Sequence, residues 1–94
     1  MKIMQLEIVS PEAQLFSGEV HSVTVPGAAG SFQILNNHAP IVSTLVEGKV
    51  KIQGKITLKE SIRSKFTQVG EVTYLDIQSG AIELSDNKVI LLTD

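Results

Sequence analysis

The chain has 94 residues, a net charge of −2 and no cysteine. Its length predicts one domain over residues 1–94, and the lack of cysteine excludes disulfides, thiolate metal ligands and a cysteine nucleophile. The slight negative charge argues against nucleic acid as the main partner. No apolar run approaches the ~18 residues of a membrane-spanning helix, so we expect no direct membrane insertion.

Apolar and polar residues alternate along much of the chain. The period of two recurs in residues 5–8, 22–25, 55–59, 74–77 and 82–85. Such short runs, rich in β-branched residues, are typical of half-buried strands. The apolar run at residues 89–92 has no polar member, and we expect it to form a closing strand that is buried on both faces.

Turn signals separate these runs at short intervals. They lie at Ser17-Gly18, Pro26-Gly27, Asn36-Asn37, Glu47-Gly48, Gly54, Gly70, Ser79-Gly80 and Asp86-Asn87. Residues 10–12 read Ser-Pro-Glu, which favours a single capped helical turn. Many short strands with frequent turns predict an all-β fold, either a sandwich or a barrel.

The basic residues are distributed unevenly. Six of the eight lie in residues 49–65, with Glu60 as the one acid among them. One interpretation is a patch that faces an acidic partner or lipid head groups. The other is a solvated strand face, which the alternation of Lys49 and Lys51 with Val50 and Ile52 favours.

Few residues favour catalysis. His21 and His38 have no partner at metal-ligand spacing, so we expect no metal, no cofactor and no catalytic residue. The glycines of residues 26–31 lack the Lys-Ser/Thr pair of a phosphate-binding loop, and we interpret this stretch as a tight connection between strands. No serine lies in a Gly-x-Ser-x-Gly motif.

His38 lies in an unusual segment, residues 32–42, between two apolar runs. Pro40 restricts the residue before it to extended geometry, and Asn36-Asn37 tolerates the left-handed backbone of a tight turn. We interpret His38 first as a hydrogen-bond partner that fixes the loop, second as a surface contact, and last as a catalytic group.

Three blocks of sequence resemble the epsilon subunit of F-type ATP synthases. They are VSPEAQLFSGEV at residues 9–20, VTVPGAAGSF followed by ILNNHAP at residues 23–40, and GAIEL with NKVIL at residues 80–91. The similarity covers nearly the whole chain except about residues 53–72. The His-Ala-Pro block is its most specific part.

The resemblance implies a sandwich of two five-stranded sheets with a mechanical function. The family's subunit lies in the central stalk, links the gamma subunit to the membrane c-ring, and couples proton translocation to ATP synthesis without catalysing it. The implied partners are gamma and the c-ring, with transient contact with the catalytic head. The implied place is the cytoplasmic face of the bacterial inner membrane. We expect no C-terminal helical hairpin, the element of longer relatives that binds nucleotide and blocks rotation.

The resemblance also implies two contact regions. The c-ring-facing residues are Gly27, Ala28, Ala29, Gly30, Ser31, Phe32, Asn37 and His38. The gamma-contact residues are Ser10, His38, Ala39, Pro40, Val42 and Ser43. We expect the loops at residues 26–32 and 36–40 to lie near each other at one end of the sandwich.

The chain departs from the family pattern at several positions. Gln33 and Asn36 replace the usual Gly and Pro, and Ser31 stands where some relatives place an acidic residue that faces the c-ring. Residues 54–70 are longer than the short hairpin of bacterial members. We expect a lengthened hairpin whose tip, near residues 63–65, lies in solvent or on a partner.

Two other functions remain open at this point. One is a free-standing β-sandwich adaptor or ligand-binding module, and the other is a small hydrolase that uses His38. A large exposed apolar patch would favour the stalk subunit. A deep pocket with convergent polar groups would favour the hydrolase.

Overall fold

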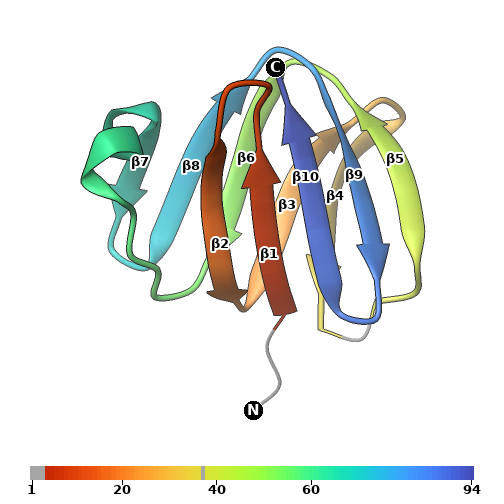
Figure 1. Cartoon of the computed structure of the whole chain (residues 1–94). Helices are drawn as coiled ribbons and strands as arrows, with labels where there is room; N and C mark the ends of the chain where they lie inside the picture. Colours follow the sequence, from red (N-terminus) through yellow and green to blue (C-terminus); the bar gives the residue numbers. More distant parts are fainter. Residues whose placement is uncertain (1–3, 37) are drawn as a thin grey trace.

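The computed structural model describes residues 4–36 and 38–94 (Figure 1). They form ten strands and the 3₁₀ helix η1 (Glu60–Lys65). The strands are β1 (Met4–Val9), β2 (Gln14–Val20), β3 (Ser22–Gly27), β4 (Gly30–Leu35), β5 (Ile41–Leu45), β6 (Gly48–Gln53), β7 (Phe66–Val69), β8 (Val72–Ile77), β9 (Gly80–Ser85) and β10 (Lys88–Thr93). No helix of this part of the chain is long and apolar enough to span a membrane.

The strands form two five-stranded layers (Figure 1). One layer has the order β2-β1-β10-β9-β5, and the other has the order β4-β3-β6-β8-β7. β1 and β10 are parallel, whereas the other neighbours are antiparallel. The layers join at one corner, where Gly27 of β3 pairs with Leu45 of β5. The predicted all-β sandwich of two five-stranded sheets is confirmed.

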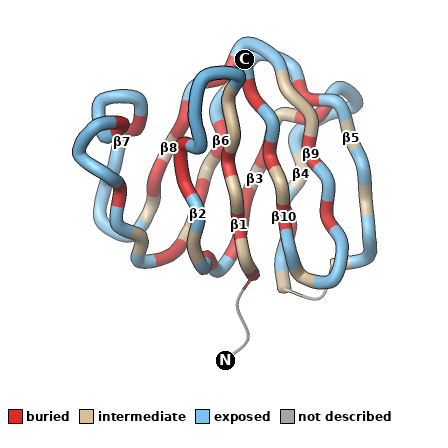
Figure 2. Tube along the Cα trace, viewed as in Figure 1, coloured by how far each residue is buried: buried red, intermediate tan, exposed pale blue. Residues whose placement is uncertain are grey.

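The core is mainly aliphatic, and buried positions recur along the strands of both layers (Figure 2). Successive strand residues point to opposite faces, so alternate residues are buried. In β1, for example, Met4, Leu6 and Ile8 are fully buried, while the residues between them are half-buried. The apolar residues in the alternating pattern are therefore the ones on the inward face of each strand.

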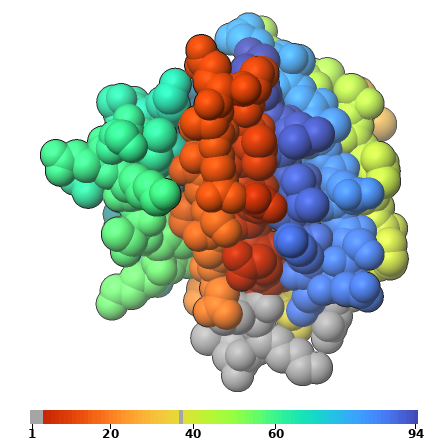
Figure 3. Space-filling view, in the orientation of Figure 1, coloured from red at the N-terminus to blue at the C-terminus, as the bar shows by residue number. Residues whose placement is uncertain are grey.

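Residues 54–65, which we call the lid, lie beside β2, on the side of the sandwich away from the β3–β5 corner (Figure 3). Leu58 and Ile62 of the lid are 4% and 8% exposed and belong to the core. Residues 63–65 are exposed, as predicted for the tip of this segment, but the segment is not a hairpin and the strand predicted at residues 55–59 is wrong. The apolar residues of this segment are buried at the open edge between the sheets, which holds the segment against the sandwich instead of letting it project.

Two of the predicted turns near the N-terminus are also wrong. Gly18 lies inside β2, where the ring of Phe16 covers it: an added Cβ would lie 2.8 Å from Phe16 Cζ. Residues 10–13 form no helical turn. Ser10 and Ala13 instead exchange backbone hydrogen bonds of 2.8 and 3.3 Å in the tight connection from β1 to β2.

Candidate functional site

An exposed apolar surface covers the outer side of β5, β9 and β10 and the end of β1. Val42 of β5 is 77% exposed, and Leu92 of β10 is 52% exposed. Ala81, Ile90 and Val9 are half-buried on the same side of the sheet. We call the surface formed by these five residues the apolar face.

Strand pairing holds the apolar face together. Residues that pair across neighbouring strands lie side by side on one face of a sheet. A shallow hollow of about 230 Å³ lies over the face, between Val42 and Leu92. The two rows of paired residues are Val42–Glu83–Ile90 and Ala81–Leu92–Val9.

The prediction that residues 89–92 are buried on both faces is therefore wrong. Val89 and Leu91 are fully buried, but Ile90 is only half-buried and Leu92 is exposed. The reason is the number of layers. A two-layer sandwich covers only one face of each sheet, so apolar residues on the other face of β10 remain at the surface.

Most residues predicted to contact the gamma subunit lie on or around the apolar face. Val42 belongs to it. Ser10 follows Val9 at one end of the sheet, and Ala39-Pro40 precedes β5 at the other end. Ser43 points to the opposite side of β5 from Val42, because strand residues alternate.

His38 is fixed by its own loop. Its backbone N–H donates to Leu35 O at 3.1 Å, and its Nδ1 lies 2.7 Å from Ala39 O. With Pro40 and Asn87, the histidine lines an open hollow of about 320 Å³. These contacts support the first interpretation of His38, a side chain that fixes the loop. Asn37, the other predicted residue of this loop, lies outside the described residues.

The predicted c-ring-facing residues do not form one edge. The β3–β4 turn, Ala28-Ala29, lies beside the end of β5, where Ala28 N–H donates to Thr44 O at 3.0 Å. His38, in contrast, precedes the start of β5. The six residues of β4, roughly 20 Å of extended chain, separate the two loops. The prediction that they lie near each other is wrong, because successive connections of one strand leave from its opposite ends.

Four of the residues around the β3–β4 turn are exposed: Ala28, Ala29, Gly30 and Ser31. Gly27 is buried inside β3, so the turn predicted at Pro26-Gly27 begins two residues later, at Ala28. The ring of Phe32 lies over this glycine, since an added Cβ would be 2.7 Å from Phe32 Cε1. Gly27 and Phe32 thus stabilise the hairpin, and the four exposed residues form its accessible tip.

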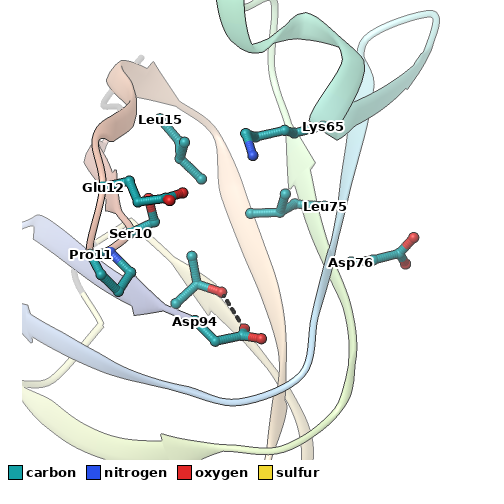
Figure 4. Close-up of a pocket in the computed structure, with 9 residues that line it drawn as sticks. Ser10, Pro11, Glu12, Leu15, Lys65, Leu75, Asp76 and Asp94 are labelled. Atoms are coloured by element: carbon teal, nitrogen blue, oxygen red, sulfur yellow. Dashed lines mark hydrogen bonds between the residues drawn. The ribbon is translucent and has the colours of Figure 1, made fainter.

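A larger hollow, of about 490 Å³, lies at the end of the sandwich next to the β1–β2 connection (Figure 4). Leu15 and Leu75 line it together with the charged residues Glu12, Lys65, Asp76 and Asp94. In Figure 4 the carboxylate of Asp76 points away from the other polar groups, and Asp94 is hydrogen-bonded to Thr93. Within residues 4–36 and 38–94, no group of three or more His, Asp or Glu side chains could hold a metal ion.

Asp94 at this hollow has a local structural role. Its Oδ1 accepts hydrogen bonds from Gln78 N–H at 3.0 Å, Ser79 N–H at 3.3 Å and the Thr93 hydroxyl at 3.0 Å. The bond from Gln78 is the main cause of a lowered pKa of the Asp94 carboxyl. The carboxylate therefore ties the end of β10 to the β8–β9 connection.

Four members of the apolar face were not predicted as site residues: Val9, Ala81, Ile90 and Leu92. The signal for Leu92 and Ile90 was present in the unbroken apolar run at residues 89–92, which we assigned to the core. Only the strand order, with no layer over the outer side of β10, distinguishes an exposed apolar face from a buried one.

Comparisons with known proteins agree with this fold. Two relatives that this chain matches over nearly their whole length are ATP synthase epsilon chains. The chain of Chlorobium limicola is 40% identical over 93 residues, which are 99% of this chain and 91% of that one. The chain of Chlorobaculum tepidum is 42% identical over the same shares.

A solved structure shows the same fold at low identity. It is a chain in the cryo-EM structure of the central stalk and c-ring of Tetrahymena thermophila mitochondrial ATP synthase, with a TM-score of 0.73 and 16% identity over 98% of this chain and 63% of that one. Residues 3–63 match the family described as ATP synthase, Delta/Epsilon chain, beta-sandwich domain. With this match and the relatives at 40% identity, the chain belongs to the ATP synthase epsilon-chain family.

Proposed function

We propose that this chain is a non-catalytic subunit of the central stalk of an F-type ATP synthase, and that its apolar face docks on the gamma subunit. In this role it holds gamma on the membrane c-ring and couples proton translocation to ATP synthesis. Its place is the cytoplasmic side of the bacterial inner membrane, with only transient contact with the catalytic head.

The observation that carries the proposal is the exposure of Val42 and Leu92 in one patch. Burying a Val or Leu side chain contributes about 1.5–3 kcal/mol, and these two residues do not gain it in the isolated chain. Clustered exposed apolar residues mark sites of protein association. A free-standing adaptor would not explain this exposed apolar cluster. A hydrolase that uses His38 would not explain why the histidine is hydrogen-bonded within its own loop.

We assign the c-ring contact to the tip of the β3–β4 hairpin. Its four exposed residues, Ala28 to Ser31, are small, so a partner's backbone can approach them closely. Ser31 offers a hydroxyl in place of a carboxylate, so this contact is a neutral one. His38, at the other end of β5, belongs with the gamma contact.

The test is recovery of partners from native membranes with a tagged chain. We expect the double variant Val42→Asp/Leu92→Asp to lose at least about 90% of the gamma subunit, because two carboxylates would be desolvated in the interface. The matched control is Val69→Asp at the opposite edge, where the valine is 65% exposed. Equal recovery by the double variant and wild type, with both folded by circular dichroism, would refute the docking assignment.

The hairpin tip is tested separately with Ser31→Arg. This variant should recover gamma normally but less c-ring, because a bulky charge at the tip disturbs that contact alone. Loss of both partners with the fold intact would show that the two contact regions are not distinct.

A further inference from the structure

The lid carries the strongest positive charge on the molecule. Lys55, Lys59, Arg63 and Lys65 are all exposed, while Leu58 and Ile62 anchor the segment in the core. Nine of the ten acidic residues of the chain lie outside residues 49–65. The molecule therefore has a basic side that is held in place by apolar anchors, and an acidic remainder.

Within residues 4–36 and 38–94, no lid cation forms an ion pair. Among the described residues, the one ion pair joins Lys49 and Asp76 at 2.7 Å, and neither belongs to the lid. Arg63 donates only to the backbone oxygen of Leu58, at 3.5 Å. Lys65 differs from the other three because it lines the hollow with Glu12, Asp76 and Asp94. Lys55, Lys59 and Arg63 are thus the cations most available to an external anion.

From this surface we infer that the lid binds the anionic head groups of a lipid bilayer and attaches the unassembled chain to the membrane. Lipid fits the lid better than an acidic protein does. Protein interfaces depend on buried apolar or aromatic anchors, and every exposed large hydrophobic of the described chain lies outside the lid: Leu35, Val42, Val46, Val69 and Leu92. Exposed lysines without such anchors suit a diffuse negative surface, where each contributes about a tenfold gain or less in binding.

The position of the lid leaves the apolar face free. The lid lies beside β2, and β2 and β5 are the two edges of the same sheet. A chain held by its lid therefore keeps Val42 and Leu92 accessible to a protein partner. The acidic remainder of the chain is repelled by the same bilayer, which favours the orientation with the lid toward the lipid. The lipid binding itself does not rest on the proposed function. The inference that it holds the chain at the membrane before assembly does rest on that function.

The experiment is cosedimentation of the full 94-residue chain with vesicles at low ionic strength. We expect binding to mixed phosphatidylglycerol–phosphatidylcholine vesicles and none to phosphatidylcholine alone, with the binding lost as salt is raised. Lys55→Ala/Lys59→Ala should weaken it about 30-fold. Neither side chain makes a hydrogen bond or an ion pair with the part of the chain that the structure describes, so the fold should be unaffected.

Two variants serve as controls. Lys49→Ala/Lys88→Ala removes the same charge from other surfaces and should change binding no more than about threefold. Arg63→Lys keeps the charge and should keep the binding. The proposal is overturned if wild type does not bind the anionic vesicles, if it binds both vesicle types equally, or if the two double variants behave alike. Lid-dependent binding to poly-glutamate without binding to vesicles would also overturn it and assign the lid to an acidic polypeptide. Recovery of gamma by the vesicle-negative variant would leave the proposed function intact.

Discussion

The lid and the apolar face use apolar residues in opposite ways. Leu58 lies outside any strand or helix and Ile62 lies in the short 3₁₀ helix η1, and yet both are almost completely buried. Val42 and Leu92 come from regular strands, and yet they are exposed. Regular secondary structure therefore does not indicate which apolar residues stabilise this domain.

The difference lies in what each region covers. The lid closes an edge of the sandwich that would otherwise expose the core, so its apolar residues contribute to folding. The apolar face lies outside a sheet whose other side is already packed, so its residues contribute to folding very little. Substitutions of the buried lid residues Leu58 and Ile62 should change stability, whereas substitutions in the apolar face should change association.

The largest effect on stability is expected for Leu58→Ala in the lid. Truncation of a buried leucine removes its contacts and leaves a cavity, which should cost about 3 kcal/mol of the free energy of unfolding in urea. The matched variant Leu92→Ala removes the same atoms from the surface and should cost no more than about 0.5 kcal/mol. Similar costs for both leucines would abolish the distinction between the two regions.

Gly80→Ala tests the strand pairing beneath the apolar face. Gly80 pairs with Thr93 at the start of β9, and an added Cβ would collide with the backbone oxygen of Leu92. We expect a loss of about 1–3 kcal/mol in unfolding free energy together with weaker gamma binding. The control is Gly70→Asn, since Gly70 has a φ of 63° in open space, where asparagine is tolerated. If Gly80→Ala were neutral, β10 would not be held as tightly against β9 as the account requires.

The smallest effect is a pH dependence at the end of β10. The pKa of Asp94 is lowered from 3.8 by the hydrogen bond from Gln78. A carboxyl whose pKa is lower in the folded than in the unfolded state stabilises the fold. The contribution is fully present above the unfolded-state pKa and is lost as the pH falls through the folded-state pKa. The melting temperature of the wild type should therefore fall slightly more than that of Asp94→Asn below about pH 4. If the carboxylate has no such role, the melting temperatures of the two proteins should change with pH in the same way.

The sequence predicted the positions of the strands better than the contacts between segments that are distant in the chain. Alternation located β1, β8 and β9, because period two depends only on the inward face of one strand. The Asp86-Asn87 signal located the β9–β10 turn, where both residues adopt positive φ values of 50° and 62°. Such features are local, and a single sequence is enough to show them.

The features that were missed depend on contacts between distant segments. Gly18 appears as a turn residue until the ring of Phe16 is known to cover it inside β2. Ile90 and Leu92 appear as core residues until the strand order leaves one side of β10 uncovered. The lid appears as a hairpin until Leu58 and Ile62 are seen between the sheets. The candidate site was therefore predictable only at Val42 and the residues beside it, and its members on β1, β9 and β10 were not.

We propose that the apolar face, and not the lid, docks on the gamma subunit. The most direct measurement is methyl NMR of the labelled chain with and without purified gamma. We expect the methyl signals of Val42, Ile90 and Leu92 to shift or broaden, while those of Leu58, Ile62 and Val69 stay unchanged. Changes confined to the lid and β7, with the three face residues unaffected, would contradict it.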